Sequence, residues 1–229
     1  LVSLHLFLSG IGEARTNIPK TKEKKIRVEI TDENKLIGTI SELLKNGGVL
    51  GIVVNTVKRA QEFGRMCKAE FGDDSVEILH SSFIAADRVK KETDLVNMIG
   101  KDGVRPEKKI VIGTQVIEQS LDIDFDVMIT DLCPIDLLLQ RAGRLHRHNI
   151  GRPIGLEEPV LYVMGTNRML KFDRGSEMVY GNYLLIRTQC YLPDIIHIPA
   201  DIPVLIRKVY GEEEPALEPP LMKVYEKSI

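Results

Sequence analysis

The stretch Val49-Leu50-Gly51-Ile52-Val53-Val54-Asn55-Thr56 carries the strongest fold signal in this chain of 229 residues. Its first six residues are continuously apolar and mostly β-branched, which is typical of a strand buried on both faces of a parallel sheet. A pattern of apolar residues at every third or fourth position follows over 57–71 and predicts a helix. The change of period predicts a strand–helix unit with two small polar residues at the junction.

Similar short apolar runs recur along the chain and alternate with helical patterns. We expect strands at 26–30, 76–79, 110–112, 127–129 and 160–163, and helices at 85–99, 134–147 and 178–190. This alternation predicts an α/β fold in three layers, with helices on both faces of a mostly parallel sheet. We expect a connector and a leading strand from an upstream domain at 1–30, the α/β domain at 31–165, and a partial, mainly helical C-terminal region at 166–229.

The composition excludes several classes of protein. Hydrophobic residues make up 43% and charged residues 28%, with a formal net charge of −2, which indicates a globular chain without a polybasic or polyacidic signature. No apolar run approaches the roughly 20 residues that cross a bilayer. The 3 cysteines are far apart, which argues against a disulfide framework and a zinc site. We expect a cytoplasmic protein without a membrane segment. Because the start lacks an initiator Met and a basic region, we expect it to come from inside a longer polypeptide.

Small polar residues follow three of the predicted strands. They are Asn55 and Thr56, His80 and Ser81, and Thr114 and Gln115. In an open parallel sheet, ligands bind beyond the carboxyl ends of the strands, where donors suited to phosphate gather. Each pair taken alone is also typical of a helix N-cap or a turn. Three pairs along one edge favour a phosphate-binding edge.

The block Gln140-Arg141-Ala142-Gly143-Arg144-Leu145-His146-Arg147-His148 contains three arginines and no acidic residue. In a continuous helix, Gln140, Arg144 and Arg147 would lie on one face. The planar guanidinium binds phosphate oxygens through two donors, and an arginine on a transferring phosphoryl group can raise the rate by about 10³ to 10⁵. The alternative is a solvated basic end of a helix. Gly143 favours the first interpretation, because glycine inside a helix costs stability and often marks a close approach of the backbone.

Two further observations concern metals and nucleotides. Asp122, Asp124 and Asp126 alternate like an acidic strand, but no histidines or cysteines stand at ligand spacing, and we predict no metal site. The chain also lacks a G-x-x-x-x-G-K-S/T loop. We therefore expect the arginine block to complete a nucleotide site formed by another domain.

Taken together, these motifs resemble those of a superfamily 2 helicase. Residues 55–56, 79–81, 113–124 and 140–147 are similar in order and spacing to motifs IV, IVa, V and VI of the second RecA-like domain. The particular variant of these motifs resembles that of the CRISPR-associated helicase-nuclease family of type I interference systems. The resemblance lies in the sequences of residues 53–57, 118–126, 183–188 and 201–210.

The resemblance implies a role for each matching residue at the nucleotide. Gln140, Arg144 and Arg147 would be catalytic and would face ATP, with the two arginines as candidate arginine fingers. Asp122 and Arg141 would bind the nucleotide, Asp122 at its sugar. ATP and Mg²⁺ would be held mainly by a first RecA-like domain that carries the Walker motifs and lies outside this chain.

The resemblance also implies a path for a nucleic-acid strand. Backbone phosphates would contact Asn55, Thr56, His80, Ser81 and Thr114. Gln115 and Glu118 would couple this path to the nucleotide site. One departure is Ser82, where this family usually carries arginine, and Arg88 is a candidate replacement.

The implied function is the C-terminal half of an ATP-dependent, 3′-to-5′ single-stranded DNA translocase or helicase in antiviral CRISPR interference, inactive without its other half. Its partners would be single-stranded DNA, the upstream RecA-like and nuclease domains, and the RNA-guided surveillance complex (Cascade). Two alternatives stay open. One is a non-catalytic nucleic-acid-binding or docking module, and the other is a related helicase that acts on RNA or in DNA repair or restriction.

Overall fold

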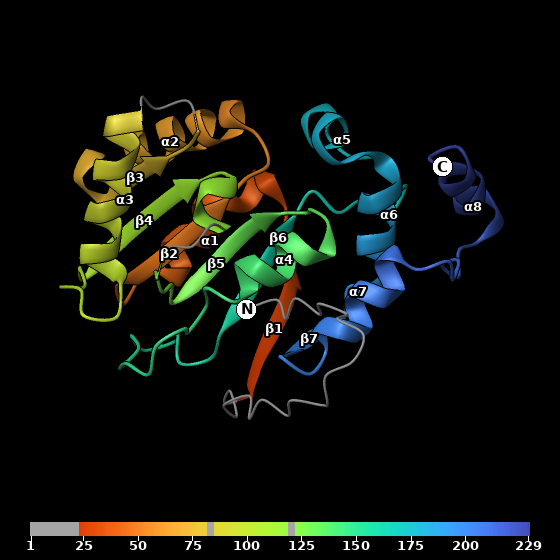
Figure 1. Cartoon of the computed structure of the whole chain (residues 1–229). Coiled ribbons are helices and arrows are strands. Elements are labelled where there is room, and N and C mark those ends of the chain that lie inside the picture. The colour runs from red at the N-terminus through yellow and green to blue at the C-terminus, as the bar shows by residue number, and fades with distance from the viewer. Residues whose placement is uncertain (1–22, 82–84, 119–121) are drawn as a thin grey trace, which may run out of the picture.

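A seven-stranded sheet forms the centre of the structure, a computed structural model that describes residues 23–81, 85–118 and 122–229. The strands are β1 (Lys24–Ile30), β2 (Gly48–Val53), β3 (Val76–Leu79), β4 (Lys108–Gly113), β5 (Val127–Asp131), β6 (Val160–Met164) and β7 (Ile195–Ile198). Their order across the sheet is β3-β4-β2-β5-β6-β1-β7 (Figure 1). All neighbours pair in parallel except β7, which is antiparallel to β1. The predicted mostly parallel α/β sheet is confirmed.

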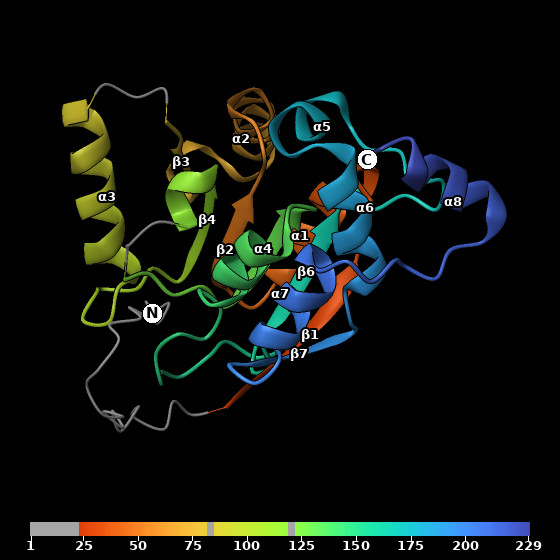
Figure 2. The ribbon, with the colours of Figure 1, turned by 45° about the vertical axis from the view of Figure 1, so that its right-hand side comes forward.

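Helices cover both faces of this sheet. Helices α1 (Leu36–Leu43) and α2 (Val57–Phe71) pack on one face. The other face is covered by α3 (Ala85–Ile99), α4 (Ile135–Ala142), α6 (Asn182–Tyr191) and α7 (Ile202–Tyr210). Helix α5 (Arg174–Tyr180) precedes α6, and α8 (Pro219–Glu226) packs on α6 on the side away from the sheet (Figures 1 and 2). The three layers are those of a RecA-like domain.

Strand β2 illustrates why the central strands read as continuous apolar runs. Alternate side chains point to opposite faces of a strand, so Leu50 and Ile52 join the core under α1 and α2, whereas Val49 and Val53 join the other core. Gly51 lies between Leu50 and Ile52 in the strand, and a Cβ atom on Gly51 would lie 3.1 Å from the Phe125 ring. Glycine at this position lets the aromatic ring approach the sheet.

The predicted helix at 134–147 is too long, because α4 ends at Ala142. Beyond it the backbone turns and forms a short parallel bridge, in which Phe125 N donates to Arg144 O at 2.9 Å and His146 N donates to Phe125 O at 3.1 Å. Helical spacing therefore does not place Arg144 and Arg147 on one face with Gln140. The expectation that Gly143 lies inside a helix is also wrong, since Gly143 is the C-cap of α4 and has an ordinary φ of −62°.

The region after residue 165 contains a strand, β7, in addition to helices, whereas the sequence predicts a mainly helical region. The helix expected at 178–190 is divided at Gly181, whose φ of +76° is the left-handed value that favours glycine. Strand β7 pairs with β1, with Ile196 opposite Ile26. The domain boundaries at 30 and 165 stay predictions, but strands outside both of them join one sheet. Among the residues that the structure describes, no helix is long and apolar enough to cross a membrane.

Candidate nucleotide and nucleic-acid site

The carboxyl ends of three neighbouring strands meet at Gly113, as the sequence predicts. Gly113 at the end of β4 lies opposite Val53 of β2 on one side and Leu79 of β3 on the other. A Cβ atom on Gly113 would lie 2.7 Å from the Leu79 carbonyl oxygen, so the close approach requires glycine. The residues that follow these three strand ends include Asn55, His80 and Thr114.

The five residues predicted to line a nucleic-acid path differ in exposure. Ser81 is exposed and Thr56 is partly buried, so these two are the accessible residues of the five. Only 2% of Asn55, 6% of His80 and 0% of Thr114 is exposed. Burial lowers the pKa of His80, and the charge of Lys91 acts in the same direction, which favours the neutral imidazole near pH 7. In this conformation, three of the five therefore lie beneath the surface that Thr56 and Ser81 present.

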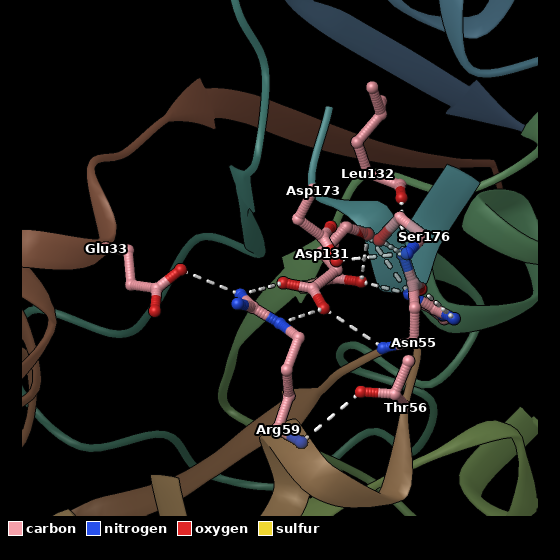
Figure 3. Close-up of polar contacts among 10 residues, drawn as sticks. Glu33, Asn55, Thr56, Arg59, Asp131, Leu132, Asp173 and Ser176 are labelled. Carbon is pink, nitrogen blue, oxygen red and sulfur yellow. Dashed lines mark hydrogen bonds and ion pairs between the residues drawn. The ribbon is translucent and has the colours of Figure 1, made fainter. Parts of the chain in front are cut away.

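Thr56 also caps α2 and lies beside a strong ion pair. Its hydroxyl accepts from the backbone N of Arg59 at 3.3 Å. The Arg59 guanidinium donates to both carboxylate oxygens of Asp131, Nε at 2.9 Å and Nη2 at 2.8 Å, and also reaches Glu33 at 2.9 Å (Figure 3). Asp131 further accepts from the backbone N of Asn55 at 3.0 Å. The ends of β2 and β5 are thus tied together beside the start of α2.

Arg141 is completely buried, with an exposed fraction of 0%. Its Nε donates to Glu118 Oε1 at 2.7 Å, its Nη1 to Thr130 Oγ1 at 2.7 Å, and its Nη2 to Asn55 Oδ1 at 3.3 Å. A guanidinium so enclosed has no surface on which to receive a nucleotide. The structure therefore does not place Arg141 where the predicted ATP contact requires it, and its side chain instead holds three elements together.

Asn55 is the centre of a buried polar cluster rather than part of an exposed path. Its side-chain nitrogen donates to the carbonyl of Leu132 at 2.8 Å and to the Ser176 hydroxyl at 2.7 Å (Figure 3). Its backbone carbonyl accepts from Gln115 Nε2 at 3.3 Å. Sequence reasoning missed Ser176, because this serine lies far along the chain, outside every recognisable motif.

Gln115 and Glu118, the predicted coupling residues, lie in a short 3₁₀ helix, η3 (Gln115–Glu118). Glu118 is buried and joins two arginines of the block. Its carboxylate accepts from Arg141, and its backbone carbonyl accepts from Arg144 Nη2 at 2.9 Å. A continuous set of hydrogen bonds therefore leads from Asn55 through Arg141 and Glu118 to Arg144.

The three predicted catalytic side chains have different surroundings. Gln140 is exposed on the last turn of α4. Arg144 is 8% exposed, and burial, together with the charge of Arg147, lowers its pKa. The Arg147 side chain is 41% exposed and donates from Nε to Asp122 Oδ1 at 2.6 Å. Gln140 and Arg147 are therefore accessible, whereas Arg144 is largely enclosed.

Asp122 is the exposed member of the acidic stretch. Partial burial acts to raise the pKa of this carboxyl group, but the hydrogen bond from Arg147 and the charges of His148, Arg147 and Arg144 outweigh burial and lower it. The His148 ring nitrogen Nε2 lies 3.3 Å from Asp122 Oδ1. The carboxylate is thus ionised near pH 7 and oriented by basic groups of the arginine block.

The other two acidic residues do not form the predicted acidic strand. Asp124 and Asp126 are buried, and Arg152 bridges them, with Nη2 at 2.8 Å from Asp124 and Nη1 at 2.7 Å from Asp126. Asp126 also accepts from the backbone N of Val49 at 2.7 Å. Among the described residues, no group of three side chains is placed to hold a metal ion. Sequence reasoning did not identify Arg152, because the partners of an arginine depend on tertiary contacts.

The departure at Ser82 lies outside the described residues. Arg88, its candidate replacement, stands on α3 and donates from Nε to Glu92 at 2.7 Å. The replacement of one phosphate contact by Arg88 stays a prediction.

Comparison with known proteins agrees with this arrangement. Residues 46–150 match the family model described as the C-terminal domain of the CRISPR-associated nuclease/helicase Cas3. Residues 46–150 therefore form a C-terminal domain of the Cas3 family. The CRISPR-associated nuclease/helicase Cas3 of Streptococcus thermophilus is 54% identical over 194 residues, which cover 85% of this chain and 21% of that protein. The three-layer domain accordingly corresponds to the second RecA-like domain of the Cas3 family.

Solved Cas3 structures share the fold over nearly the whole chain. The T. fusca Cas3-ATP structure is 32% identical with a TM-score of 0.81, over 94% of this chain and 27% of that one. A chain of a CRISPR RNA-guided surveillance complex before nicking is 31% identical with a TM-score of 0.75, over 90% of this chain and 27% of that one. The chain thus spans about a fifth to a quarter of the length of the Cas3 proteins it matches.

Proposed function

We propose that this chain is the second half of an ATP-dependent, 3′-to-5′ single-stranded DNA translocase that acts in antiviral CRISPR interference of type I. The observation that carries the proposal is the buried connection from Asn55 through Arg141 and Glu118 to Arg144. Such a connection joins the strand end beside Thr56 to the arginine block. A motor needs this kind of link, because ATP turnover must change the grip on the strand.

At the nucleotide, the proposed roles differ in accessibility. Gln140 and Arg147 are exposed donors suited to phosphate oxygens, and the Asp122 carboxylate is suited to a sugar hydroxyl. Arg144 would reach the γ-phosphate once the two RecA-like domains close. Bound ATP with Mg²⁺ supplies the phosphoryl group that water attacks, and Mg²⁺ would be held by the first RecA-like domain.

At the nucleic acid, Thr56 and Ser81 would donate to backbone phosphates, with His80 and Thr114 beneath them. Hydroxyl contacts to phosphates position a strand without reading its sequence. This fits a translocase that must move along any DNA. We assign Asn55 to orienting this edge from below, because its side chain is already bonded inside the protein.

The proposed partners extend beyond this chain. They are single-stranded DNA, an upstream RecA-like domain with Walker motifs, a nuclease domain, and an RNA-guided surveillance complex (Cascade), in the cytoplasm. The surveillance-complex structure supports the last of these partners, because a chain within it has the same fold at 31% identity.

The experiment that tests the proposal uses the full-length protein, with ATP hydrolysis and strand binding measured separately. Arg147→Ala and Arg144→Lys should each lower DNA-stimulated hydrolysis by about 10³-fold or more, because each removes a guanidinium from the transferring phosphoryl group. Affinity for single-stranded DNA should stay within about twofold in fluorescence anisotropy.

Two controls complete this experiment. Arg65→Ala removes an exposed arginine on α2, away from the arginine block, and should leave hydrolysis unchanged. The isolated 229-residue chain should not hydrolyse ATP. Loss of strand binding with intact hydrolysis would contradict the assignment, and matched RNA that stimulates better than DNA would favour an RNA helicase.

A further inference from the structure

Helix α5 lies outside the helicase motifs but packs directly on the end of β2. The hydroxyl of its buried Ser176 accepts from Asn55 Nδ2 at 2.7 Å (Figure 3). A Cβ atom on the neighbouring Gly175 would lie 2.9 Å from Thr56 Cγ2, so the helix backbone is in close contact with Thr56. One end of α5 is thus fixed against both residues that follow β2.

The other end of α5 contacts the coupling helix η3. The hydroxyl of Tyr180 accepts from Gln115 Nε2 at 3.3 Å, and the same amide nitrogen reaches the Asn55 carbonyl at 3.3 Å. Burial raises the pKa of Tyr180, while the charge of Arg141 opposes this shift, so the phenol stays neutral near pH 7. Asn55 is therefore linked to α5 directly through Ser176 and indirectly through Gln115.

These contacts leave Asn55 little freedom. Its amide nitrogen is shared between Ser176 and Leu132, so its amide oxygen faces the Arg141 guanidinium. Buried donors and acceptors are costly to leave without partners. A change at Arg141 that moves Asn55 must therefore also move Ser176, and with it α5.

Helix α5 is well suited to move as a unit. Asp173 caps its start by accepting from Ser176 N at 3.0 Å, and Gly181 separates it from α6. Its outer residues Met178 and Val179 are exposed, so they do not tie the helix to the core. The face of the helix that contacts Asn55, Thr56 and Gln115 attaches it to the domain, and Tyr180 also packs against the core.

We infer that Ser176 and Tyr180 are positioning residues that make α5 part of the link between the nucleotide site and the strand-binding edge. This inference rests on the proposed function and deepens it. Ser176 sets the orientation of the Asn55 amide, and Tyr180 sets that of Gln115. Without them, nucleotide binding is no longer transmitted to Thr56, although each ligand can still bind.

The test measures this coupling in the full-length protein. The affinity for single-stranded DNA is determined with and without a non-hydrolysable ATP analogue. We expect the analogue to change the wild-type affinity by about tenfold, within the usual range for coupled sites. In Ser176→Ala and in Tyr180→Phe the change should fall below about twofold, while the affinities for each ligand alone stay within about twofold of wild type.

The matched control is Met178→Ala, on the exposed side of the same helix, which should keep the full wild-type change. Tyr180→Phe retains the aromatic ring and its packing, so it tests the inference even if Ser176→Ala fails to fold. If both folded variants keep the wild-type change, or if they weaken binding of DNA alone, the inference is wrong. If the wild-type protein itself shows no change with the analogue, the proposed function fails first.

Discussion

Arg141 and Arg144 belong to one sequence block but do different work. Arg141 is enclosed on all sides and pairs with the carboxylate of the buried Glu118, whereas Arg144 donates from Nη2 to the backbone carbonyl of the same residue. Taking an ion pair out of water is costly, and the pair is retained only if its geometry is good. We interpret the Arg141–Glu118 pair as the contact that fixes the position of Glu118, whose backbone carbonyl in turn orients Arg144.

Breaking this pair should therefore destabilise the domain strongly. We expect Arg141→Met and Glu118→Gln each to lower the free energy of unfolding by about 3–5 kcal/mol, because each leaves a buried charge without its partner. The double variant Arg141→Met/Glu118→Met should lose less than the sum of the two single losses. Urea denaturation of the 229-residue chain measures all of these. A single-variant loss below about 1 kcal/mol would contradict the interpretation.

At the scale of elements, the sequence reveals most where an element is buried on both faces. The bounds of β2, β4, β5 and β6 could be predicted within a few residues because each strand contains a continuous apolar run, and β3 could be predicted although Glu77 interrupts its run. The edge strand β7 was missed, since only one of its sides pairs with a neighbour and its residues are mostly half-buried. The end of α4 was misplaced because the bridge between Phe125 and Leu145 is a tertiary contact that no local periodicity reports.

The packing of β2 against Phe125 gives a prediction at this scale. Gly51→Ala should lower the free energy of unfolding by about 1–3 kcal/mol, because the added methyl group would press on the Phe125 ring. Gly38 is the matched control, since it is exposed within α1 and its Cβ would meet nothing within 4 Å. Gly38→Ala should raise the free energy of unfolding by about 0.5–1 kcal/mol. Thermal unfolding should separate the two variants, and equal effects would refute the packing argument.

At the scale of the whole molecule, one buried arginine holds the C-terminal segment to the domain. Arg187 on α6 is fully buried and pairs with no carboxylate among the described residues. Its guanidinium donates instead to the Tyr225 hydroxyl at 2.8 Å and to the carbonyls of Lys208, Gly211 and Glu213 at 2.6, 2.9 and 2.7 Å. It therefore joins α6, the end of α7, the following tail and α8.

Removal of this arginine should release the C-terminal segment and leave the sheet folded. We expect Arg187→Met to speed hydrogen exchange over residues 211–226 by about tenfold or more, because several carbonyls lose their donor. Arg187→Lys should not restore protection, since an ammonium group cannot span the same acceptors. Exchange over β2 and β5 should be unchanged. Equal acceleration in the sheet would show that Arg187 supports the whole core instead.

The candidate site could be predicted from the sequence only in part. The three strand ends and the arginine block were found because motifs lie in continuous stretches. The exposure of these residues could not be predicted, because the burial of Asn55 depends on its contact with Ser176, which belongs to a distant segment of the chain. Likewise, the enclosure of Arg141 follows from Thr130 and Glu118, which lie on other elements.

The position of β1 between β6 and β7 also bears on how the chain reaches its native state. Arg27 pairs with Val160 and Ile26 with Ile196, so both partners of β1 lie far along the chain. During synthesis, the apolar side chains of Ile26 and Val28 emerge well before the strands that bury them. Pairing between such distant segments is slow, and strands that wait for partners are prone to aggregate. We infer that the sheet forms first from β2, β4 and β5 and then extends outward. Strand β1 would pair last, when β7 is available to pair with its other side.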